Sequence, residues 1–286
     1  MIKRNYRLAA ASLLSMFATY TFAMTEEVNM VPVQLDGDTV ELEIIVHKPD
    51  GYQQGTKLPT VILNHGSTGW GTNPSYFTAK IDYFDALIAY FGDRGWAVAV
   101  PMRRGRGNSE GLYDEGFDSN RKYGYTCETG RSLAGAQRAL DDVHASVEAI
   151  EAMPFVDTEN LIIGGISRGG ILSTAYAGEH PDKFKGIINF VGGWMGDGCP
   201  TAEGINGSLF VRGAATKVES IWLYGNNDHY YRMSHSQSNF NKFVAAGGKG
   251  DFHQVNVEPG QNGHFIGSYP QKWTALMDEY LDDRNL

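Results

Sequence analysis

Apolar and polar positions along the chain form two patterns, which are short apolar runs and longer segments with helical spacing. Residues 59–64 and 96–100 are continuous apolar runs, which are typical of strands buried on both faces of a parallel sheet. Residues 131–153 carry apolar side chains at steps of three and four, which predicts an amphipathic helix. The same patterns predict strands over 40–47, 59–64, 96–100, 161–166, 184–191, 220–224 and 252–257, and helices over 75–91, 131–153, 168–179, 234–246 and 271–282.

Alternation of strands and helices implies parallel pairing through right-handed crossovers, so the predicted fold class is α/β with a mostly parallel central sheet. A chain of 286 residues is compatible with one large domain, which we expect over residues 24–286. Two segments, 105–130 and 192–217, interrupt the alternation. They are rich in glycine, and we expect them to be long functional loops.

The N-terminal segment has the features of a signal peptide over residues 1–23. Lys3, Arg4 and Arg7 precede a short apolar stretch, and Thr21-Phe22-Ala23 forms a small-residue cleavage site. The alternative is a membrane anchor, but the apolar stretch is shorter than the ~20 residues that a spanning helix needs. We therefore expect a secreted or periplasmic mature protein without stable membrane anchoring.

The composition is acidic, with 24 Lys and Arg against 33 Asp and Glu and a formal net charge of -9. Removal of the predicted signal peptide would take away three positive charges and no negative ones. Such a surface repels phosphate backbones, so nucleic acid is not expected as a partner. The pattern leaves the oligomeric state open.

A nucleophile elbow is predicted where the strand 161–166 meets the helix 168–179. Gly165-Ile166-Ser167-Arg168-Gly169 reads G-x-S-x-G, in which glycines allow the sharp turn that projects the serine hydroxyl. The N-terminus of the following helix favours negative charge near that hydroxyl. The alternative interpretation is a glycine-rich turn with a structural role only.

Serine needs a general base and an acid that orients it. Asp228 follows the strand 220–224, and His264 follows the next strand and precedes the last helix, so we predict these two residues as acid and base. His65 is expected to brace its turn, and His253 lies within a predicted strand. No H-E-x-x-H or Cys/His ligand spacing is present, so we expect neither a metal site nor a cofactor.

An oxyanion hole needs two backbone donors. We expect one from the N–H of Arg168 and the other from the turn after the strand 59–64. Ser67 is the predicted second donor, with Thr68 as the alternative.

These residues lie in motifs that resemble those of the α/β-hydrolase superfamily, in its dienelactone-hydrolase-like and prolyl-oligopeptidase-like branch. The motifs are N-H-G-S-T-G at 64–69, R-R-G-R-G-N-S-E-G at 103–111, G-I-S-R-G-G at 165–170, Y-G-N-N-D at 224–228 and N-G-H-F at 262–265. The resemblance covers roughly residues 40 to 285 and implies the α/β-hydrolase fold. It also implies a triad of Ser167, Asp228 and His264. Dienelactone hydrolases proper have a cysteine nucleophile, so Ser167 argues against dienelactone cleavage. No large cap domain or propeller is present in the sequence, which implies an open site.

The two long segments carry the only two cysteines, Cys127 and Cys199. In an oxidising compartment they can form a disulfide, and in a reducing one they would be free thiols. We hypothesise that the two loops meet as a roof over Ser167 and that a disulfide fixes them there. The alternative is two independent loops.

Trp70 and Trp194 are candidates for lining a substrate pocket, although packing roles are equally compatible with the sequence. Four arginines could contact an anionic substrate or brace loops through carboxylates such as Glu110 and Asp114; they are Arg103, Arg104, Arg106 and Arg121.

The predicted function is hydrolysis of a small carboxylic ester through an acyl-enzyme. The alternatives are a peptidase or amidase with the same triad, and a non-catalytic binding protein on the same fold.

Overall fold

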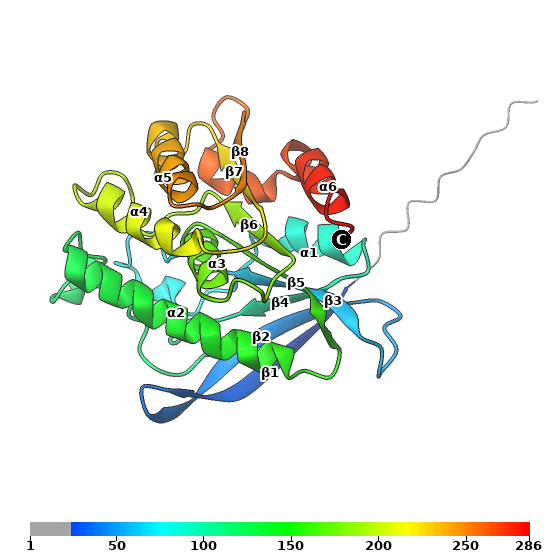
Figure 1. The fold of residues 1–286 in the computed structure, drawn as a ribbon. Helices are drawn as coiled ribbons and strands as arrows, with labels where there is room; N and C mark the ends of the chain where they lie inside the picture. Colours follow the sequence, from blue (N-terminus) through cyan, green and yellow to red (C-terminus); the bar gives the residue numbers. More distant parts are fainter. Residues whose placement is uncertain (1–23) are drawn as a thin grey trace, which may run out of the picture.

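One eight-stranded sheet runs through residues 24–286, which are the residues described by the computed structural model (Figure 1). The strand order is β1-β2-β4-β3-β5-β6-β7-β8. Pairing is antiparallel for β1–β2 and β2–β4, and parallel for the remaining neighbours. The strands are Met24–Leu35 (β1), Asp38–Pro49 (β2), Leu58–Asn64 (β3), Ala97–Pro101 (β4), Val156–Ile166 (β5), Gly186–Phe190 (β6), Ser220–Gly225 (β7) and Gly250–Val255 (β8). The predicted α/β class with a mostly parallel sheet is confirmed, whereas the signal peptide predicted over residues 1–23 lies outside the described residues.

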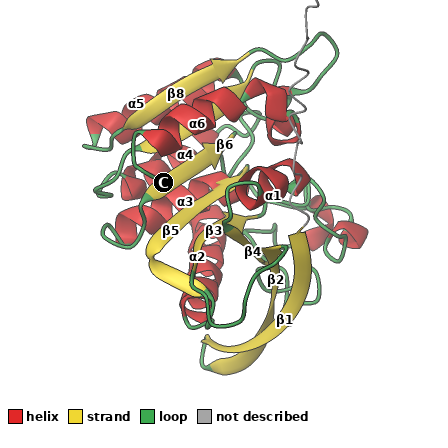
Figure 2. Ribbon diagram, turned by 90° about the vertical axis from the view of Figure 1, so that its right-hand side faces the viewer, coloured by secondary structure: helices red, strands yellow, loops and turns green. Residues whose placement is uncertain are grey.

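Helices cover both faces of the sheet (Figures 1 and 2). The α-helices are Asp85–Gly92 (α1), Thr129–Glu151 (α2), Arg168–Glu179 (α3), Ala202–Gly213 (α4), Met233–Ala245 (α5) and Thr274–Asp282 (α6). Short 3₁₀ turns lie at Pro74–Tyr76 (η1), Arg121–Tyr123 (η2), Gly263–Ser268 (η3) and Pro270–Lys272 (η4). Helices α2 to α5 form one layer, while α1 and α6 share the other face, where Tyr90 donates to Asp278 (2.8 Å). No helix between residues 24 and 286 has the length and apolar character needed to cross a bilayer.

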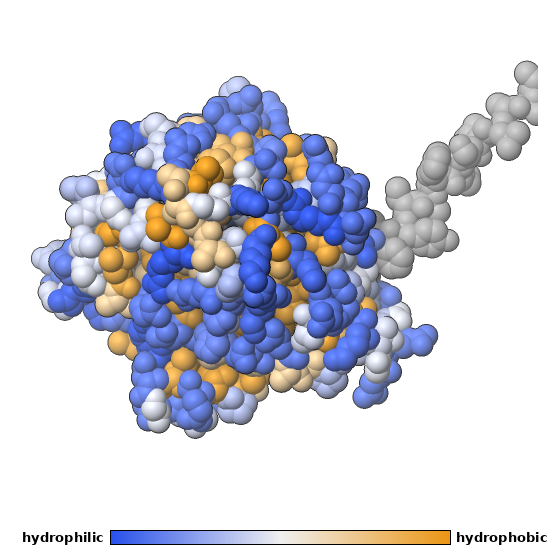
Figure 3. Space-filling view, in the orientation of Figure 1, coloured by the Kyte–Doolittle hydropathy of each residue, from blue (hydrophilic) through white to orange (hydrophobic). Residues whose placement is uncertain are grey.

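The core consists of apolar side chains between the sheet and its two helical layers. Its strand residues are fully buried at positions such as Val61, Ile62, Ile163 and Ile188. Polar and charged residues cover most of the face shown in Figure 3, with smaller apolar patches between them.

Two expected elements differ from the structure. The helix expected over 75–91 is limited to Asp85–Gly92, since residues 75–80 are largely exposed and have no apolar stripe to bury. The segment 192–217, expected as a loop, contains the twelve-residue helix α4. Its glycines lower helix propensity but allow close packing, because a Cβ on Gly213 would lie 2.6 Å from the carbonyl oxygen of Thr174 in α3.

Candidate active site

Ser167 occupies a sharp turn between β5 and α3. Its backbone has φ 58° and ψ −122°, a strained conformation for a residue other than glycine. The amide of Ser167 donates to the carbonyl of Phe190 (2.9 Å), and its carbonyl accepts from the amide of Gly193 (3.2 Å). Gly169 is required by close approach, because a Cβ there would lie 1.7 Å from the carbonyl oxygen of Asn64. The turn is therefore held between β3 and β6, with Ser167 at its apex.

Asp228 and His264 lie together at the ends of neighbouring strands. The Nδ1 atom of His264, in η3, lies 2.9 Å from Oδ2 of Asp228, which follows β7. The other carboxylate oxygen accepts the amides of Tyr230 (2.7 Å) and Tyr231 (3.1 Å). The Asp228 side chain is 2% exposed, so its orientation is fixed by these bonds. The contact through Nδ1 leaves Nε2 as the ring nitrogen available to a reacting group.

Asn262 joins the two loops that carry Asp228 and His264, and sequence reasoning missed it. Its side-chain oxygen accepts the amides of His264 (3.0 Å) and His229 (3.2 Å). An asparagine side chain often accepts the backbone amide of the residue two positions later in the chain. The N-G-H sequence at 262–264 was therefore the available signal for this role.

Ser167 and His264 both line one cavity of about 300 Å³. In the described part of the chain no hydrogen bond joins the Ser167 hydroxyl to the His264 ring. Tyr231 also lines the cavity, and burial raises the pKa of its hydroxyl. Apolar and aromatic side chains form most of the remaining wall, namely Trp70, Tyr83, Tyr125, Ile166, Trp194, Met195, Tyr230 and Phe265.

The turn after β3 lies directly against the elbow. A Cβ placed on Gly66 would be 3.3 Å from the Cβ of Ser167. The neighbouring Ser67 and the residue after the predicted nucleophile, Arg168, both line the cavity. The two predicted oxyanion donors are therefore brought to the same wall as Ser167.

Tyrosine hydroxyls occupy the amides on either side of Ser67. The amide of Gly66 donates to Tyr83 (2.8 Å), and the amide of Thr68 donates to Tyr125 (3.2 Å). The Ser67 amide has no acceptor within residues 24–286. This arrangement favours Ser67 over Thr68 as the donor that is available to a ligand.

His65 is buried beneath the same turn. Its Nδ1 contacts the carbonyl of Gly66 (2.7 Å), and its Nε2 accepts the amide of Arg103 (3.2 Å). Burial, together with the Arg103 charge, holds the pKa of His65 well below its usual value. A neutral ring with both nitrogens engaged fits the bracing role expected from the sequence.

The four arginines considered for an anionic substrate do not line the cavity. Three of them pair with carboxylates, as Arg103 with Glu115 (2.6 Å), Arg104 with Asp142 (2.5 Å) and Arg121 with Asp114 (3.3 Å). The fourth, Arg106, has a buried side chain. These arginines therefore brace loops and do not contact a substrate in the cavity. The expected partner Glu110 does not pair with an arginine, because its carboxylate accepts a hydrogen bond from the backbone amide of Glu41.

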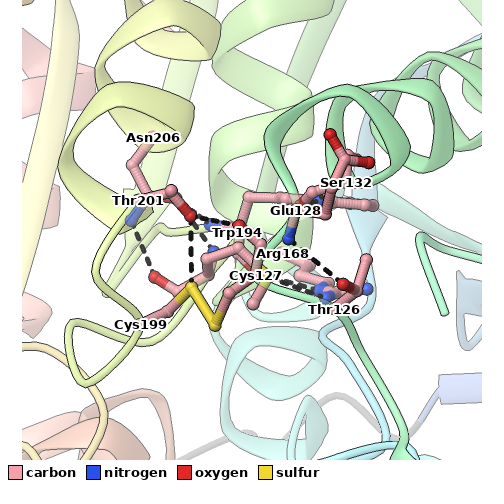
Figure 4. The surroundings of a disulfide bond; sticks show 10 residues. Thr126, Cys127, Glu128, Ser132, Arg168, Trp194, Cys199, Thr201 and Asn206 are labelled. Carbon is pink, nitrogen blue, oxygen red and sulfur yellow. Dashed lines mark hydrogen bonds between the residues drawn. A yellow bond between two sulfur atoms is a disulfide. The ribbon is translucent and has the colours of Figure 1, made fainter. Parts of the chain in front are cut away.

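Cys127 and Cys199 form a disulfide between the two glycine-rich segments (Figure 4). Both residues line the cavity that holds Ser167. The hydroxyl of Thr201 donates to the carbonyl of Cys127, which adds a second link between the segments. The segments are thus fastened to each other beside the cavity.

Trp70 and Trp194 both line the cavity but differ in exposure. Trp70 is 67% exposed and lies 6.3 Å from the ring of Tyr230 at the cavity edge. Trp194 is fully buried, and its indole N–H donates to Ser132 (3.1 Å). Trp70 therefore lies at the exposed rim of the cavity, and Trp194 forms part of its buried wall.

No cluster of three or more His, Cys, Asp or Glu side chains suited to a metal ion occurs among residues 24–286. The cavity wall contains no Asp, Glu or Lys, and its ionisable members apart from tyrosines are Arg168 and His264. The described wall therefore holds one charged side chain, that of Arg168, which is paired with Glu115 (3.1 Å).

Comparison with known proteins agrees with this architecture. Residues 82–195 match the prolyl oligopeptidase family. A Klebsiella pneumoniae structure described as a dienelactone hydrolase is 16% identical, with a TM-score of 0.59 over 91% of this chain and 98% of that chain. Est1E from Butyrivibrio proteoclasticus, solved with ferulic acid bound, is 15% identical, with a TM-score of 0.60 over 89% of this chain and 98% of that chain.

A third similar structure is an acylaminoacyl peptidase, which is 18% identical with a TM-score of 0.60. The match covers 92% of this chain but 41% of that peptidase. Structures described as esterases and peptidases thus share the overall fold of this chain. The chain therefore has the fold of the α/β-hydrolase superfamily.

Proposed function

We propose that this protein is a serine hydrolase that cleaves a carboxylic ester through an acyl-enzyme. The observation that carries the proposal is the Asp228–His264 contact of 2.9 Å beside a cavity whose wall includes Ser167 at a strained elbow. Each residue type matches the role that acyl transfer needs, which is nucleophile, base and orienting acid. A non-catalytic binding protein would have no need of this combination.

In the proposed mechanism His264 accepts the proton of the Ser167 hydroxyl as that oxygen attacks the ester carbonyl. Asp228 fixes the ring orientation and stabilises the imidazolium. The amides of Arg168 and Ser67 donate to the oxyanion that develops. The alcohol leaves with a proton from His264, and water activated by the same ring then hydrolyses the acyl-enzyme.

The cavity wall supports a neutral substrate with an apolar or aromatic part. Aromatic side chains dominate the wall, and no Asp, Glu or Lys lines it. Arg103, Arg104, Arg106 and Arg121 do not line it either, and the guanidinium of Arg168, which does, is already paired with Glu115 (3.1 Å). The ferulic acid bound by Est1E is an aromatic acid, although that complex describes the other protein.

A peptidase activity is the second candidate, because residues 82–195 match the prolyl oligopeptidase family. The described wall offers no carboxylate to a free amino terminus, which disfavours an aminopeptidase. A blocked peptide remains compatible with the wall. The charge of the cavity therefore argues against an aminopeptidase, and substrate kinetics must separate an ester from a blocked peptide.

The test compares nitrophenyl esters of neutral aliphatic and aromatic acids with matched N-acylated aminoacyl nitroanilides, which represent a blocked peptide. We expect ester hydrolysis to dominate, and Ser167→Ala and His264→Ala each to lower kcat by about 10⁴-fold or more. His253→Ala is the matched control, since His253 is a half-buried histidine on β8 outside the cavity, and it should retain wild-type activity. Hydrolysis that survives Ser167→Ala would contradict the proposal, and equal anilide turnover would favour the peptidase.

We also propose export of the protein, with residues 1–23 removed. The Cys127–Cys199 disulfide supports an oxidising compartment. The mass of the protein recovered from the cell exterior or periplasm would test the expected start at Met24.

A further inference from the structure

Three buried charged side chains connect the turn after β3 to the elbow. Arg103, Glu115 and Arg168 have side chains that are 1%, 4% and 2% exposed. Glu115 bridges the two arginines, at 2.6 Å from Nε of Arg103 and 3.1 Å from Nη1 of Arg168. Burial opposes ionisation of Glu115, but the two guanidinium charges outweigh it and keep its pKa below the usual range. All three groups are therefore charged at neutral pH.

Arg103 grips the backbone of the turn that precedes the Ser67 amide. Its guanidinium donates to the carbonyls of His65 (2.9 Å) and Gly66 (3.3 Å). Because the Gly66 carbonyl and the Ser67 amide belong to one planar peptide group, the bond to that carbonyl also fixes the direction of the Ser67 N–H. Arg103 thus orients one proposed oxyanion donor.

Two tyrosine hydroxyls connect Glu115 to the Thr68 amide of the same turn. Tyr113 donates to Glu115 (3.0 Å) and lies 2.7 Å from the hydroxyl of Tyr125. Tyr125 in turn accepts the amide of Thr68 (3.2 Å). The peptide groups before and after Ser67 are therefore both fixed by bonds that begin at Glu115.

The other proposed oxyanion donor is the backbone amide of Arg168, whose side chain is equally constrained. Its guanidinium donates to the carbonyl of Glu115 (2.9 Å) and to that of Trp194 (3.0 Å). It lies between two aromatic rings, 3.6 Å from that of Tyr125 and 4.0 Å from that of Trp194. The start of α3 is thereby tied to the same carboxylate as the turn.

We propose that Glu115 is a positioning residue that sets the two oxyanion donors, Ser67 and Arg168, relative to each other. The proposal rests on the serine hydrolase function proposed above. Donors that are fixed before reaction stabilise developing negative charge without reorganising, so a small displacement costs rate and leaves substrate binding largely unchanged. The segment 105–130 thus holds the two oxyanion donors in place through Glu115, in addition to lining the cavity.

The test uses Glu115→Gln and Arg103→Lys, with Asp142→Asn and Arg104→Lys as matched controls. Asp142 and Arg104 form an equally buried pair, each 4% exposed, that does not contact the turn or the elbow. Arg103→Lys keeps a positive charge facing Glu115 and removes the guanidinium that grips the turn. If circular dichroism shows that Glu115→Gln does not fold, the Arg103→Lys variant alone tests the proposal.

We expect Glu115→Gln and Arg103→Lys to lower kcat by about 10- to 100-fold with KM within about threefold, since only the transition state uses the oxyanion donors. Affinity for a trifluoromethyl ketone, which forms a tetrahedral adduct, should fall by the same factor as kcat/KM. The two controls should change kcat less than about threefold, even where they lower the melting temperature.

Equal loss of kcat in the Glu115→Gln and Asp142→Asn variants would overturn the proposal, because it would indicate a purely structural role. Unchanged ketone affinity in both Glu115→Gln and Arg103→Lys would overturn it as well. Failure of the proposed function looks different, since the wild-type protein would then neither hydrolyse esters nor bind the ketone.

Discussion

At the scale of single residues, the backbone conformation of Ser167 depends on nearby glycines, which have no Cβ atom. Gly169 permits the contact with Asn64, and Gly193 leaves room for the ring of Tyr231, which would lie 2.4 Å from a Cβ there. These close approaches keep Ser167 at φ 58°. The strain at the elbow is therefore maintained by packing on both of its sides.

Glu115 gives a residue-scale prediction about pH. Because folding lowers its pKa, ionised Glu115 contributes stability above its unfolded pKa of about 4.5, and this contribution is lost as pH falls through the folded value. We expect the wild-type advantage in unfolding free energy over Glu115→Gln to be constant near neutral pH and to shrink below about pH 4.5. Urea unfolding of both proteins between pH 3 and 8 measures this difference. An advantage that does not change with pH would contradict the charged state assigned to Glu115.

The residues of the candidate site could be predicted from sequence to different extents. Ser167, Asp228 and His264 stand in short local motifs at strand ends, so their positions are encoded by nearby residues. Glu115 has no such motif, since its partners Arg103 and Arg168 meet it only through tertiary packing. Asn262 had a local signal in N-G-H that was not interpreted.

At the scale of secondary-structure elements, the hairpin of β1 and β2 was only half predicted. Asp36 and Gly37 both have positive φ and form a two-residue turn that pairs Leu35 with Asp38. Asp-Gly between alternating segments is a strong hairpin signal. The strand β1 was missed because its apolar side chains do not keep to one face, since Val28 and Met30 are exposed whereas Val33 and Leu35 are buried.

The strands β3, β4, β6 and β7 and the second half of β5 were predicted because each is a continuous apolar run, whereas β8 also contains Asp251, His253 and Gln254. Helix α4 was not predicted, because Gly204, Gly207 and Gly213 give it the composition of a loop. Its helical state depends on packing against α3, which local propensity does not include. Gly213, one of the glycines that obscure the helix, is thus part of what allows this packing.

The disulfide gives an element-scale prediction. It closes a loop over a sequence separation of 72 residues, and the chain-entropy relation gives a stabilisation of about 4 kcal/mol. Cys127→Ser/Cys199→Ser should lower the unfolding free energy by up to about that amount and raise KM more than it changes kcat, because both residues line the cavity. Urea unfolding and ester kinetics measure these effects, and wild-type protein treated with reductant should behave in the same way. Unchanged stability and unchanged KM would contradict a role for the bond in fixing the two segments.

At the scale of the whole molecule, the sheet brings together residues that are far apart along the chain. β3, β5, β7 and β8 are parallel, so the loops at their carboxyl ends lie at one edge and carry Ser67, Ser167, Asp228 and His264. The fold class was predictable because this alternation extends over most of the chain. The shape and charge of the cavity were not, since they depend on the segments 105–130 and 192–217 and on how the disulfide joins them.

The most direct test of this account is to identify the residue that an alkyl fluorophosphonate modifies, using peptide mass spectrometry. We predict a single adduct on Ser167 in the wild-type protein, and loss of that adduct in His264→Ala, while His253→Ala remains labelled. An unmodified wild-type protein, or an adduct on a different serine such as Ser67, would contradict the assignment of Ser167 as the nucleophile.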